Sequence, residues 1–480
     1  MAGRLTALEA DPAAERPAST PTHQASGEPA VVRPAACLRG ELALPGDKSV
    51  SHRALILAAL AEGESRISGA GDGADVRSTA RIVAGLGTTV ERVPGSDGNV
   101  AYRVLSPGAG GLREPDGVLD CGNSGTSLRL LAGVLAGLPM TTILDGDSSL
   151  RRRPVARIIE PLRSMGATLH ARRGDSLPPV TIVGRHPLRA VDVVTPVPSA
   201  QVKSAILLAA LRAAGTTSVT ESVATRDHTE RMLRVRGVRV HRADTEEGGV
   251  TVSLEGGQHV QPIDERVPGD VSAAMFWLVA GSIHPDAELL IRGVGVNPTR
   301  RGGIDLLRRM GADIHEQPLP IVAGAAPDGA DTPLADVAGE PMADLTVRSS
   351  ALRGIDIGPR EVAAAIDELP ILCLAATRAA GRTTIRGAGE LRHKESDRIG
   401  GIAAGLRALG GRIDVDGDDI TIDGASSLSG AATDSLGDHR LAMTFAVAGL
   451  IAGGETSIAA ASSAAVSYPS FLGDLERIRA

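Results

Sequence analysis

Three lysines stand out among the charged residues of this 480-residue chain. The chain has 50 lysine and arginine residues, yet only Lys48, Lys203 and Lys394 are lysine. Arginine has therefore taken over the usual lysine role of a solvated surface charge. A lysine that persists in such a composition favours a task that arginine cannot perform, such as that of a compact ammonium group that exchanges a proton. Chance retention is the alternative interpretation, and the three positions are candidate functional sites.

Lys48 lies in the stretch PGDKS at residues 45–49, which is followed by Arg53 and the apolar run 54–61. This pattern predicts a tight turn into a buried helix, with Lys48, Ser49 and Arg53 in or just before its first turn. A helix N-terminus offers unpaired N–H groups and the positive end of the helix dipole. Together with an ammonium, a hydroxyl and a guanidinium group, it predicts a phosphate or carboxylate site. A helix cap with surface cations is the alternative.

The elements that must position these residues form a repeat. A helix of small apolar residues, a turn and a short strand recur six times, and equivalent strands are 76, 76, 72, 94 and 73 residues apart. The long fourth step predicts an insertion around residues 316–344, which are rich in Pro, Ala, Gly and Asp. The strands are centred on Ile67, Ile143, Val219, Ile291, Ile385 and Ile458, and the helices precede them at residues 54–61, 128–138, 205–214, 273–281, 371–380 and 441–452.

A polar turn precedes each of the six apolar helices. A second helix in several units ends at a glycine followed by a strand, as at Gly166, Gly311 and Gly410, which is typical helix-stop chemistry. If the repeats pack with pseudo-symmetry, the six N-termini can converge on one cleft and concentrate N–H groups, dipoles and cations on an anionic ligand. The polar turns are residues 46–49, 122–126, 198–201, 268–270, 366–368 and 437–440.

The composition restricts the classes of partner. The net charge is −7, and the chain has one Trp, two Tyr and three Phe. An acidic chain has no general attraction to nucleic acid or to an anionic membrane, and six aromatic side chains leave little for base stacking. No apolar run reaches the length of a membrane span. We therefore expect small-molecule partners, with no nucleic acid and no membrane.

The cysteines and the N-terminal segment indicate the compartment. Cys37, Cys121 and Cys373 form no CxxC pair, and an odd number in a long chain favours a reducing environment. Residues 1–30 are rich in Ala, Pro, Ser and Thr and carry acidic residues, unlike a secretory or transit signal. We interpret them as a disordered tail and expect a cytoplasmic protein. No spacing of His, Cys and Asp indicates a metal site, so we expect neither a metal nor a cofactor.

Five motifs occur together, and the chain from about Arg39 to Leu475 resembles the 5-enolpyruvylshikimate-3-phosphate synthase family. The resemblance implies an α/β fold, namely a two-domain inverse α/β barrel (the enolpyruvyl transferase fold) built from six βαβαββ repeats, three per domain. It further implies a monomer with its active site in the cleft between the domains. The implied first domain is discontinuous, residues 31–47 plus 266–480, and the second is residues 48–265. The motifs are PGDKS at 45–49, GNSGT at 122–126, RDHTE at 226–230, KESDR at 394–398 and DHR at 438–440.

The resemblance implies transfer of the enolpyruvyl group of phosphoenolpyruvate to the 5-hydroxyl of shikimate 3-phosphate, with release of phosphate, in the shikimate pathway to aromatic amino acids. Each substrate phosphate carries about −1.5 to −2 charges near neutral pH, so the site needs many cations. The implied shikimate 3-phosphate contacts are Lys48, Ser49, Arg53, Ser199, Ala200, Gln201, Arg226, Asp367 and Lys394. The implied phosphoenolpyruvate contacts are Lys48, Asn123, Gly125, Arg153, Gln201, Arg398 and Arg440.

The same reaction needs proton transfer twice, because the methylene carbon of phosphoenolpyruvate gains a proton and the 5-hydroxyl loses one. The resemblance implies Asp367, Glu395 and Lys48 as catalytic residues, with Asp367 at the hydroxyl and Glu395 at the methylene carbon. Spacing alone does not separate these roles, and Asp367 is also a candidate helix N-cap. We expect Lys203 only to support the site. Three histidines, His52, His228 and His439, are expected to hold loops rather than to catalyse.

Two departures from the family pattern bear on function. Some members of the family carry a further lysine near the C-terminus, where this chain has Ala465, Val466 and Ser467. Position 125 is glycine rather than alanine, and a side chain there would crowd the phosphoenolpyruvate pocket. We therefore expect sensitivity to glyphosate, which overlaps that pocket.

Three alternatives remain open. A same-fold enzyme that transfers enolpyruvyl to a UDP-amino sugar uses a cysteine before an Arg-Pro pair, whereas residues 145–149 of this chain contain none. A relative with another shikimate-like acceptor would need only small changes near Ser199 or Arg226. A non-catalytic binding protein, or an RNA-end enzyme of related architecture, is disfavoured by Asp367 and Glu395, by the acidic charge and by the scarcity of aromatic residues.

Overall fold

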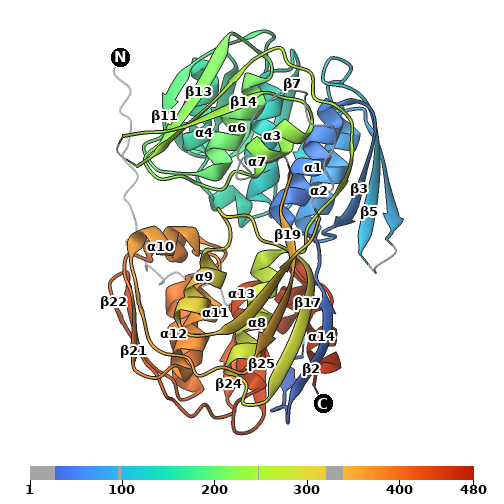
Figure 1. Cartoon of the computed structure of the whole chain (residues 1–480). Helices are drawn as coiled ribbons and strands as arrows, with labels where there is room; N and C mark the ends of the chain where they lie inside the picture. The colour runs from blue at the N-terminus through green and yellow to red at the C-terminus, as the bar shows by residue number, and fades with distance from the viewer. Residues whose placement is uncertain (1–27, 96–98, 247, 321–338, 480) are drawn as a thin grey trace, which may run out of the picture.

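The computed structural model describes residues 28–95, 99–246, 248–320 and 339–479. The chain forms two domains that lie one above the other (Figure 1), and each has its own hydrophobic core. The core of the upper domain begins at Val50 and ends at Val267. The core of the lower domain begins with Val32, Leu38, Leu42 and Leu44 and resumes at residue 271. Within the described residues, no helix combines the length and apolar character needed to cross a membrane.

The upper domain contains helices and strands that alternate along the chain (Figure 1). Its helices are α1 (Lys48–Leu60), α2 (Ala74–Gly85), α3 (Gly125–Ala136), α4 (Ala156–Ser164), α5 (Arg172–Asp175), α6 (Ala200–Ala210) and α7 (His228–Val235), with a 3₁₀ turn η1 (Leu150–Arg152). Its strands are β3 (Glu62–Ala70), β4 (Thr89–Pro94), β5 (Val100–Pro107), β6 (Leu119–Asp120), β7 (Thr141–Asp145), β8 (Thr168–Ala171), β9 (Leu177–Val183), β10 (Leu188–Arg189), β11 (Asp192–Val194), β12 (Ala213–Ala214), β13 (Thr216–Glu221), β14 (Val240–Asp244), β15 (Val250–Glu255) and β16 (Asp264–Arg266).

The lower domain combines the N-terminal strands with the C-terminal half of the chain. Its helices are α8 (Val271–Ile283), α9 (Gly302–Arg309), α10 (Pro359–Ala364), α11 (Leu369–Arg378), α12 (Arg398–Ala408), α13 (His439–Gly449) and α14 (Phe471–Arg477), with 3₁₀ turns η3 (Gly389–His393) and η4 (Ala461–Val466). Its strands are β1 (Ala30–Val32), β2 (Leu38–Ala43), β17 (Ala287–Gly295), β18 (Asp313–Pro318), β19 (Met342–Arg348), β20 (Asp356–Ile357), β21 (Arg382–Ile385), β22 (Arg412–Asp416), β23 (Asp419–Asp423), β24 (Ala432–Asp434) and β25 (Thr456–Ala459).

Two predicted segments fall largely outside the described residues. The predicted tail, residues 1–30, is described only from residue 28, and Ala30 already pairs with Ile458 at the start of an ordered strand. Residues 321–338 of the predicted insertion are also not described, and the ends of that segment belong to β18 and β19.

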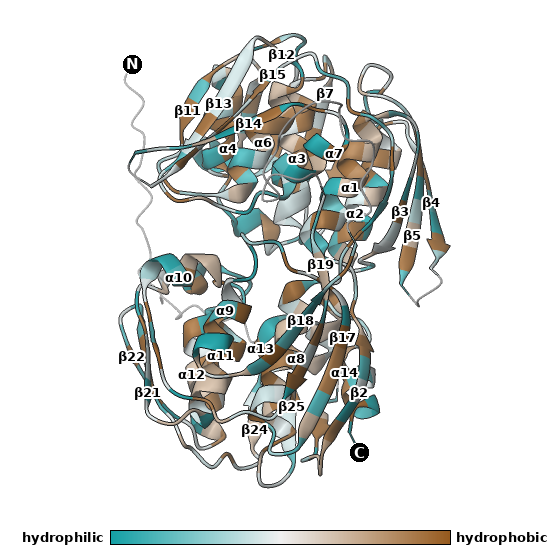
Figure 2. Cartoon of the chain, in the orientation of Figure 1, coloured by the Kyte–Doolittle hydropathy of each residue, from teal (hydrophilic) through white to brown (hydrophobic). Residues whose placement is uncertain are grey.

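The six predicted helix–strand pairs are confirmed as α1–β3, α3–β7, α6–β13, α8–β17, α11–β21 and α13–β25. Their helices lie inside the domains and the strands outside, so hydrophobic colour concentrates on the central helices and on alternate strand residues (Figure 2). All 13 residues of α8 are buried, as expected for a helix that is apolar all round. A Cβ on Gly133 in α3 would lie 2.1 Å from the backbone oxygen of Ala205 in α6, so glycine allows these two helices to touch.

Five sheets share one pattern, in which a short strand runs parallel to a central strand that also pairs with an antiparallel hairpin. In the sixth sheet β24 is parallel to β25 and β1 supplies an antiparallel edge. This is the predicted βαβαββ unit, three per domain. The strand orders are β16-β3-β5-β4, β6-β7-β9-β8, β11-β13-β15-β14, β2-β17-β19-β18, β20-β21-β23-β22 and β24-β25-β1.

The chain crosses between the domains twice, because β2 precedes α1 but pairs with β17, and β16 precedes α8 but pairs with β3. The two crossing segments bind each other through Asp47 N–H to the Pro268 oxygen at 2.7 Å and Asp270 N–H to the Pro45 oxygen at 3.0 Å. A Cβ on Gly46 would lie 1.9 Å from the Gly69 oxygen, so only glycine fits this crossing.

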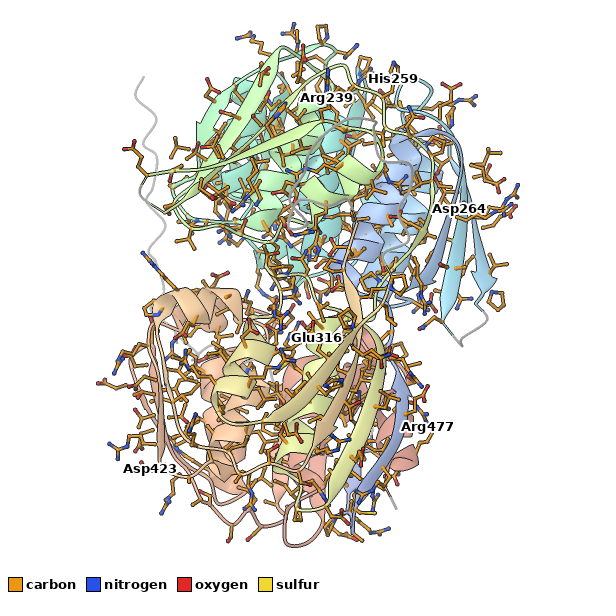
Figure 3. The ribbon with its side chains drawn as sticks, in the orientation of Figure 1. Arg239, His259, Asp264, Glu316, Asp423 and Arg477 are labelled. Carbon is orange, nitrogen blue, oxygen red and sulfur yellow. The ribbon has the colours of Figure 1, made fainter. Side chains whose placement is uncertain are left out.

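Charged side chains cover the outer surfaces of both domains, as Arg239 and Asp423 illustrate in Figure 3. Glu316 lies nearer the junction of the domains and pairs with Arg301 and Arg308 of the lower domain at 3.1 and 3.2 Å. Many of these described surface charges lie in ion pairs, as in this group.

Candidate active site between the domains

The predicted site residues come from both domains and meet at the N-terminal ends of the central helices. Asp47, Ser124 and Ser199 precede α1, α3 and α6, and the equivalent positions below are Asp270, Glu368 and Asp438. Contacts that cross between the domains here include Lys48 N–H to Asp270 Oδ2 at 3.2 Å, Arg153 to Glu395 at 3.6 Å and Arg226 to Asp367 at 2.6 Å.

Lys48 is the first residue of α1 and its side chain is 32% exposed. Its Nζ lies 2.9 Å from Oδ2 of Asp75 in α2, a residue that the sequence analysis did not single out. Burial is the largest influence on the pKa of Lys48 and lowers it, but the carboxylates of Asp75 and Glu395 outweigh burial, so the net pKa is raised. Lys48 is thus held as a cation at neutral pH, facing the groups of the lower domain.

Arg53 lies one turn further along α1 than predicted and is buried rather than exposed. Its guanidinium donates to the Ser49 oxygen at 2.9 Å, Thr229 Oγ1 at 2.7 Å and Ser204 Oγ at 2.9 Å. Burial lowers its pKa to about 10, which still leaves it charged at neutral pH. The alternative of a surface cation is therefore wrong for Arg53, and Ser49 lies half-buried beside it.

The predicted phosphoenolpyruvate residues of the upper domain form two hydrogen-bonded pairs. Arg153 donates to Asn123 Oδ1 at 2.7 Å, and Gln201 accepts from Arg129 Nη1 at 2.7 Å. A Cβ on Gly125 would lie 2.7 Å from that same Arg129 nitrogen and 3.5 Å from Arg153. Arg129 was not predicted, although its place four residues after Gly125 on one helix was the available signal.

The loop before α7 brings Arg226 across the gap between the domains. Arg226 donates to Asp367 Oδ2 at 2.6 Å. On the same wall, the Ser199 N–H donates to Glu221 Oε1 at 3.2 Å, and Ala200 is the first residue of α6. The predicted shikimate 3-phosphate segment and Arg226 therefore belong to one wall of the upper domain.

Asp367 lies among four cations. Its carboxylate is 2.6 Å from Arg226, and three groups of the lower domain are 3.7 to 4.0 Å away: Lys394, Arg398 and Arg440. Burial is the largest influence on the pKa of Asp367 and raises it, but these cations hold the net pKa well below its usual range. The helix N-cap here is Glu368, so the interpretation of Asp367 as a cap is wrong.

Glu395 is the second predicted carboxyl group, and its side chain is 28% exposed. It accepts from Arg398 Nη2 at 2.5 Å and lies 3.6 Å from Arg153 of the opposite domain. Burial would raise its pKa, but Arg398 and the neighbouring His439, Arg153 and Lys48 lower it. Glu395 and Asp367 are thus both ionised and each faces an arginine from above.

Arg398 links the two carboxyl groups to a third. It is 1% exposed, and its Nε donates to Asp438 Oδ2 at 2.8 Å. Its Nη1 has no hydrogen-bond partner among the described residues and lies 3.7 Å from Asp367. Asp438, which is fully buried, also caps α13 by accepting from the Arg440 N–H at 2.8 Å. The DHR motif therefore supplies a supporting acid that was not among the predicted site residues.

Known proteins match this chain over nearly its whole length. Residues 32–475 match the family described as EPSP synthase (3-phosphoshikimate 1-carboxyvinyltransferase). The chain belongs to the EPSP synthase family. A 3-phosphoshikimate 1-carboxyvinyltransferase of Gloeobacter violaceus is 49% identical over 454 residues, 94% of this chain and 99% of the relative. One of Geobacter sulfurreducens is 46% identical over 445 residues, 93% of this chain and 98% of the relative.

Solved structures give the same result for the EPSP synthase fold. The EPSP synthase of Acinetobacter baumannii has a TM-score of 0.82 and 39% identity, covering 94% of this chain and 98% of its own. The enolpyruvyl transferase NikO of Streptomyces tendae has a TM-score of 0.72 over the same shares but only 20% identity, so it shares the fold alone. The resemblance and the fold class predicted from the sequence are confirmed.

The three histidines of the EPSP synthase motifs are buried, and two of them have polar partners. His52 Nδ1 lies 2.7 Å from Thr79 Oγ1, and His228 Nδ1 lies 2.8 Å from Glu340 Oε1 of the lower domain. Burial lowers the pKa of His52 to about 3 and that of His439 to about 4. His52 and His439 are therefore neutral in the folded protein, in keeping with a structural role.

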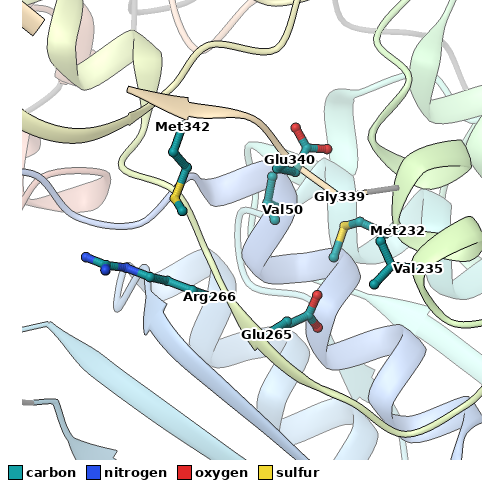
Figure 4. Close-up of a pocket in the computed structure, with 8 residues that line it drawn as sticks. All are labelled: Val50, Met232, Val235, Glu265, Arg266, Gly339, Glu340 and Met342. Carbon is teal, nitrogen blue, oxygen red and sulfur yellow. The ribbon is translucent and has the colours of Figure 1, made fainter. Parts of the chain in front are cut away.

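One small cavity lies away from the predicted site of this EPSP synthase family member. It has a volume of about 40 Å³, lies behind α1 near the domain crossing, and is lined by Val50, Met232, Glu340 and Met342 among others (Figure 4). None of the predicted site residues lines it. Among the described residues, no group of three or more His, Cys, Asp or Glu side chains is arranged to hold a metal ion.

Proposed function

We propose that this member of the EPSP synthase family transfers the enolpyruvyl group of phosphoenolpyruvate to the 5-hydroxyl of shikimate 3-phosphate in the shikimate pathway. The observation that carries the proposal is the pair of carboxylates, Asp367 and Glu395, which lie beside Arg398 and each also lie near an arginine of the upper domain. Two phosphorylated anions need cations such as these, because each phosphate carries about −1.5 to −2 charges.

The upper domain is the proposed binding wall for the acceptor. A phosphate group fits the N-terminus of α1, where Lys48, Ser49 and the buried Arg53 lie together. The start of α6 and Arg226 continue this wall. The proposed shikimate 3-phosphate residues are Lys48, Ser49, Arg53, Ser199, Ala200, Gln201 and Arg226, joined from below by Asp367 and Lys394.

Phosphoenolpyruvate is proposed to bind between the walls, because its phosphate and carboxylate need cations on two sides. Arg153 from above and Arg398 and Arg440 from below supply them, and the missing side chain of Gly125 leaves room beside Arg129. The proposed phosphoenolpyruvate residues are Lys48, Asn123, Gly125, Arg153, Gln201, Arg398 and Arg440.

The proposed chemistry has two steps. In the first, the 5-hydroxyl oxygen bonds to C2 of phosphoenolpyruvate while Asp367 accepts the hydroxyl proton. At the same time Glu395 gives a proton to the methylene carbon, which becomes a methyl group. In the second, the Glu395 carboxylate takes a proton back from the methyl group of this tetrahedral adduct. The C–H electron pair restores the enolpyruvyl double bond, and the C2–O bond to phosphate breaks, so that phosphate leaves with that electron pair. Lys48 stabilises the charge on the transferred group and shares in proton transfer.

Glu395 must hold a proton to act as an acid, yet its pKa is lowered by the surrounding cations. Two bound anions place negative charge beside the same cations, and like charge raises the pKa of a carboxyl group. Substrate binding is therefore proposed to return Glu395 toward its protonated form. The same shift makes Asp367 a stronger base at the moment the hydroxyl approaches.

The test is phosphate release from purified protein given phosphoenolpyruvate, with and without shikimate 3-phosphate. We expect release only with both substrates, and a fall in kcat of about 10²- to 10⁴-fold in Glu395→Gln, the range for loss of a general acid. Glu288→Gln on the surface is the control, since Glu288 is exposed and pairs with exposed Arg348 on an outer sheet. Release without shikimate 3-phosphate, or full activity in Glu395→Gln, would contradict the proposal.

Further proposals concern organisation. We propose domain boundaries that place residues 31–47 plus 266–480 in one domain and 48–265 in the other. The two separate cores and the paired crossing segments support this division, except that Arg266 and Val267, at the second crossing, pack with the upper domain. A cytoplasmic location is proposed as well, supported by the three unpaired cysteines, and the monomer is carried over from the family resemblance. No cofactor is needed for the proposed chemistry.

A further inference from the structure

Lys203 lies below the surface of the upper domain and contacts two buried acids. Its side chain is 1% exposed, and those of Glu221 and Glu230 are 0% and 3% exposed. The Lys203 Nζ lies 2.9 Å from Glu221 Oε2 and 2.8 Å from Glu230 Oε1. These three residues are here named the buried triad. Buried charges need partners, because removing them from water costs free energy. Two carboxylates buried around one ammonium group suggest that the group fixes the segments that carry it.

The geometry around Nζ explains why this position is lysine in a chain that otherwise uses arginine. An ammonium group has three N–H donors, and three oxygens surround the Lys203 Nζ: one from each glutamate within 2.9 Å, and the Thr225 backbone oxygen at 3.4 Å. A planar guanidinium is larger and directs its donors in a fixed fork. The glutamates outweigh burial and raise the pKa of Lys203, so it stays charged.

Glu221 links the buried triad to the proposed acceptor wall by hydrogen bonds to two of its segments. It accepts from the Ser199 N–H at 3.2 Å, which fixes the start of α6. It also accepts from Thr225, through the hydroxyl at 2.7 Å and the N–H at 3.4 Å. Thr225 directly precedes Arg226, so one buried carboxylate holds both segments that bear proposed acceptor contacts.

A second branch of the network starts at Ser204, the neighbour of Lys203. Ser204 Oγ accepts from Arg53 Nη2 at 2.9 Å and from Thr229 Oγ1 at 2.7 Å, and Thr229 in turn accepts from Arg53 Nε at 2.7 Å. Thr229 precedes Glu230 of the buried triad. Arg53 and Lys203 thus balance Glu221 and Glu230, two positive charges against two negative, within one buried network.

We propose that Lys203 is a positioning residue that, through the buried triad, fixes Ser199, Arg53 and Arg226 as a single preformed wall for the phosphorylated acceptor. This inference rests on the proposed function. It assigns Lys203 to binding of shikimate 3-phosphate, not to proton transfer and not to binding of phosphoenolpyruvate. The buried triad does not touch the residues assigned to phosphoenolpyruvate on the lower domain.

The main variant is Lys203→Met combined with Glu230→Gln, which keeps the buried charge balanced between Arg53 and Glu221. The matched control is Arg236→Met with Glu265→Gln, another buried ion pair of the same domain that lies apart from the acceptor wall. We expect KM for shikimate 3-phosphate to rise about 10- to 100-fold, the range for lost support of a ligand set. KM for phosphoenolpyruvate should change less than about threefold.

A merely structural role would leave both KM values unchanged, or raise both equally, in variants that still fold. Either result with active wild-type protein would overturn the Lys203 proposal and leave the proposed function standing. In the control we expect a lower melting temperature with both KM values unchanged.

Amide hydrogen exchange tests the positioning without turnover. We expect faster exchange at Ser199 and at Thr225 in the main variant, and unchanged exchange there in the control. Unchanged exchange in the main variant would overturn the proposal. If wild-type protein fails to release phosphate with shikimate 3-phosphate, the proposed function fails; faster exchange would still support the positioning of this wall for another acceptor.

Discussion

The upper and lower domains each form one wall of the proposed active site, and the charged side chains of the two walls have different partners. In the upper wall, Arg53 donates three hydrogen bonds of 2.7 to 2.9 Å, and the Lys203 Nζ lies within 2.9 Å of two buried glutamates. In the lower wall, Asp367 accepts one hydrogen bond, from Arg226 of the opposite wall at 2.6 Å, and lies 3.7 to 4.0 Å from three further cations. Arg398 donates to Glu395 and Asp438, but its Nη1 is buried without a hydrogen-bond partner among the described residues.

This difference indicates a division of work. Groups whose hydrogen bonds are satisfied within the protein keep a fixed geometry, as binding requires. Groups held by longer ion pairs retain donors and acceptors that a substrate can take, and their pKa values change when its charge arrives. We therefore propose that the upper wall holds the anionic acceptor and that the lower wall exchanges protons with the substrates.

Loss of a lower-wall carboxylate should have the largest effect. We expect Asp367→Asn to lower kcat by about 10²- to 10⁴-fold, because the amide cannot accept the hydroxyl proton. KM for shikimate 3-phosphate should change far less, since most of its proposed contacts are in the upper wall. Asp423→Asn, at the outer edge of the lower domain, is the control for steady-state phosphate release. A large change in KM for shikimate 3-phosphate with normal kcat would contradict the proposed division of binding and proton transfer between the two walls.

Breaking the buried pair beneath the lower wall should mainly cost stability. Asp438→Asn leaves Arg398 without its fully buried partner, and we expect the free energy of unfolding of the lower domain to fall by about 3 kcal/mol. Trp277, the one tryptophan of the chain, lies in the core of the lower domain and reports this in urea titrations by fluorescence. A change below about 1 kcal/mol would show that Glu395 alone satisfies Arg398.

The buried histidines extend the comparison to pH. Unfolded histidine binds a proton near pH 6.5, whereas the folded pKa is about 3 for His52 in the upper domain and about 4 for His439 in the lower. Between these values the unfolded state binds more protons, so the free energy of unfolding falls as pH is lowered from 6.5, by up to about 1.4 kcal/mol per pH unit for each histidine.

This pH dependence can be assigned to one domain at a time. Urea titrations that follow Trp277 give the free energy of unfolding of the lower domain at each pH between 5.0 and 6.5. The dependence of this free energy on pH should become weaker in His439→Gln and stay the same in His52→Gln. The window lies above the range in which the carboxylates with lowered pKa values begin to protonate. His241→Gln, at an exposed position, is the control and should leave this dependence unchanged. Equal effects of His52→Gln and His439→Gln would show that the two domains unfold as one unit.

The smallest expected effect is at Gly125, where both walls approach phosphoenolpyruvate. In Gly125→Ala the new Cβ meets Arg129 Nη1, the flexible end of a side chain, so the protein should fold and KM for phosphoenolpyruvate should rise less than about tenfold. Glyphosate should inhibit the natural protein more strongly than Gly125→Ala in the same assay. Equal inhibition of both would contradict the proposed overlap of glyphosate with this pocket.

The six helix–strand pairs could be predicted because their signals are local. A helix made of small apolar residues must be buried on all sides, and the strand that follows can be read from β-branched residues between turns. Gly166, Gly311 and Gly410 mark helix ends because each adopts a positive φ, at 102°, 104° and 88°. Residue types also determined the chemistry, since lysine, arginine and carboxylate groups in these motifs suit anions and protons.

The partner of each charge was decided only by the tertiary structure. Lys48 pairs with Asp75, 27 residues away, Arg398 with Asp438, 40 residues away, and Arg226 with Asp367, 141 residues away. The exchange of β2 and β16 between the domains likewise depends on pairings more than 190 residues apart. Turn residues and the periodicity of apolar residues are local features that can be recognised in the sequence. An ion pair depends on the distance in space between two residues that are far apart along the chain. The same limit explains why Lys203 could be noticed in the sequence, while its buried triad could not.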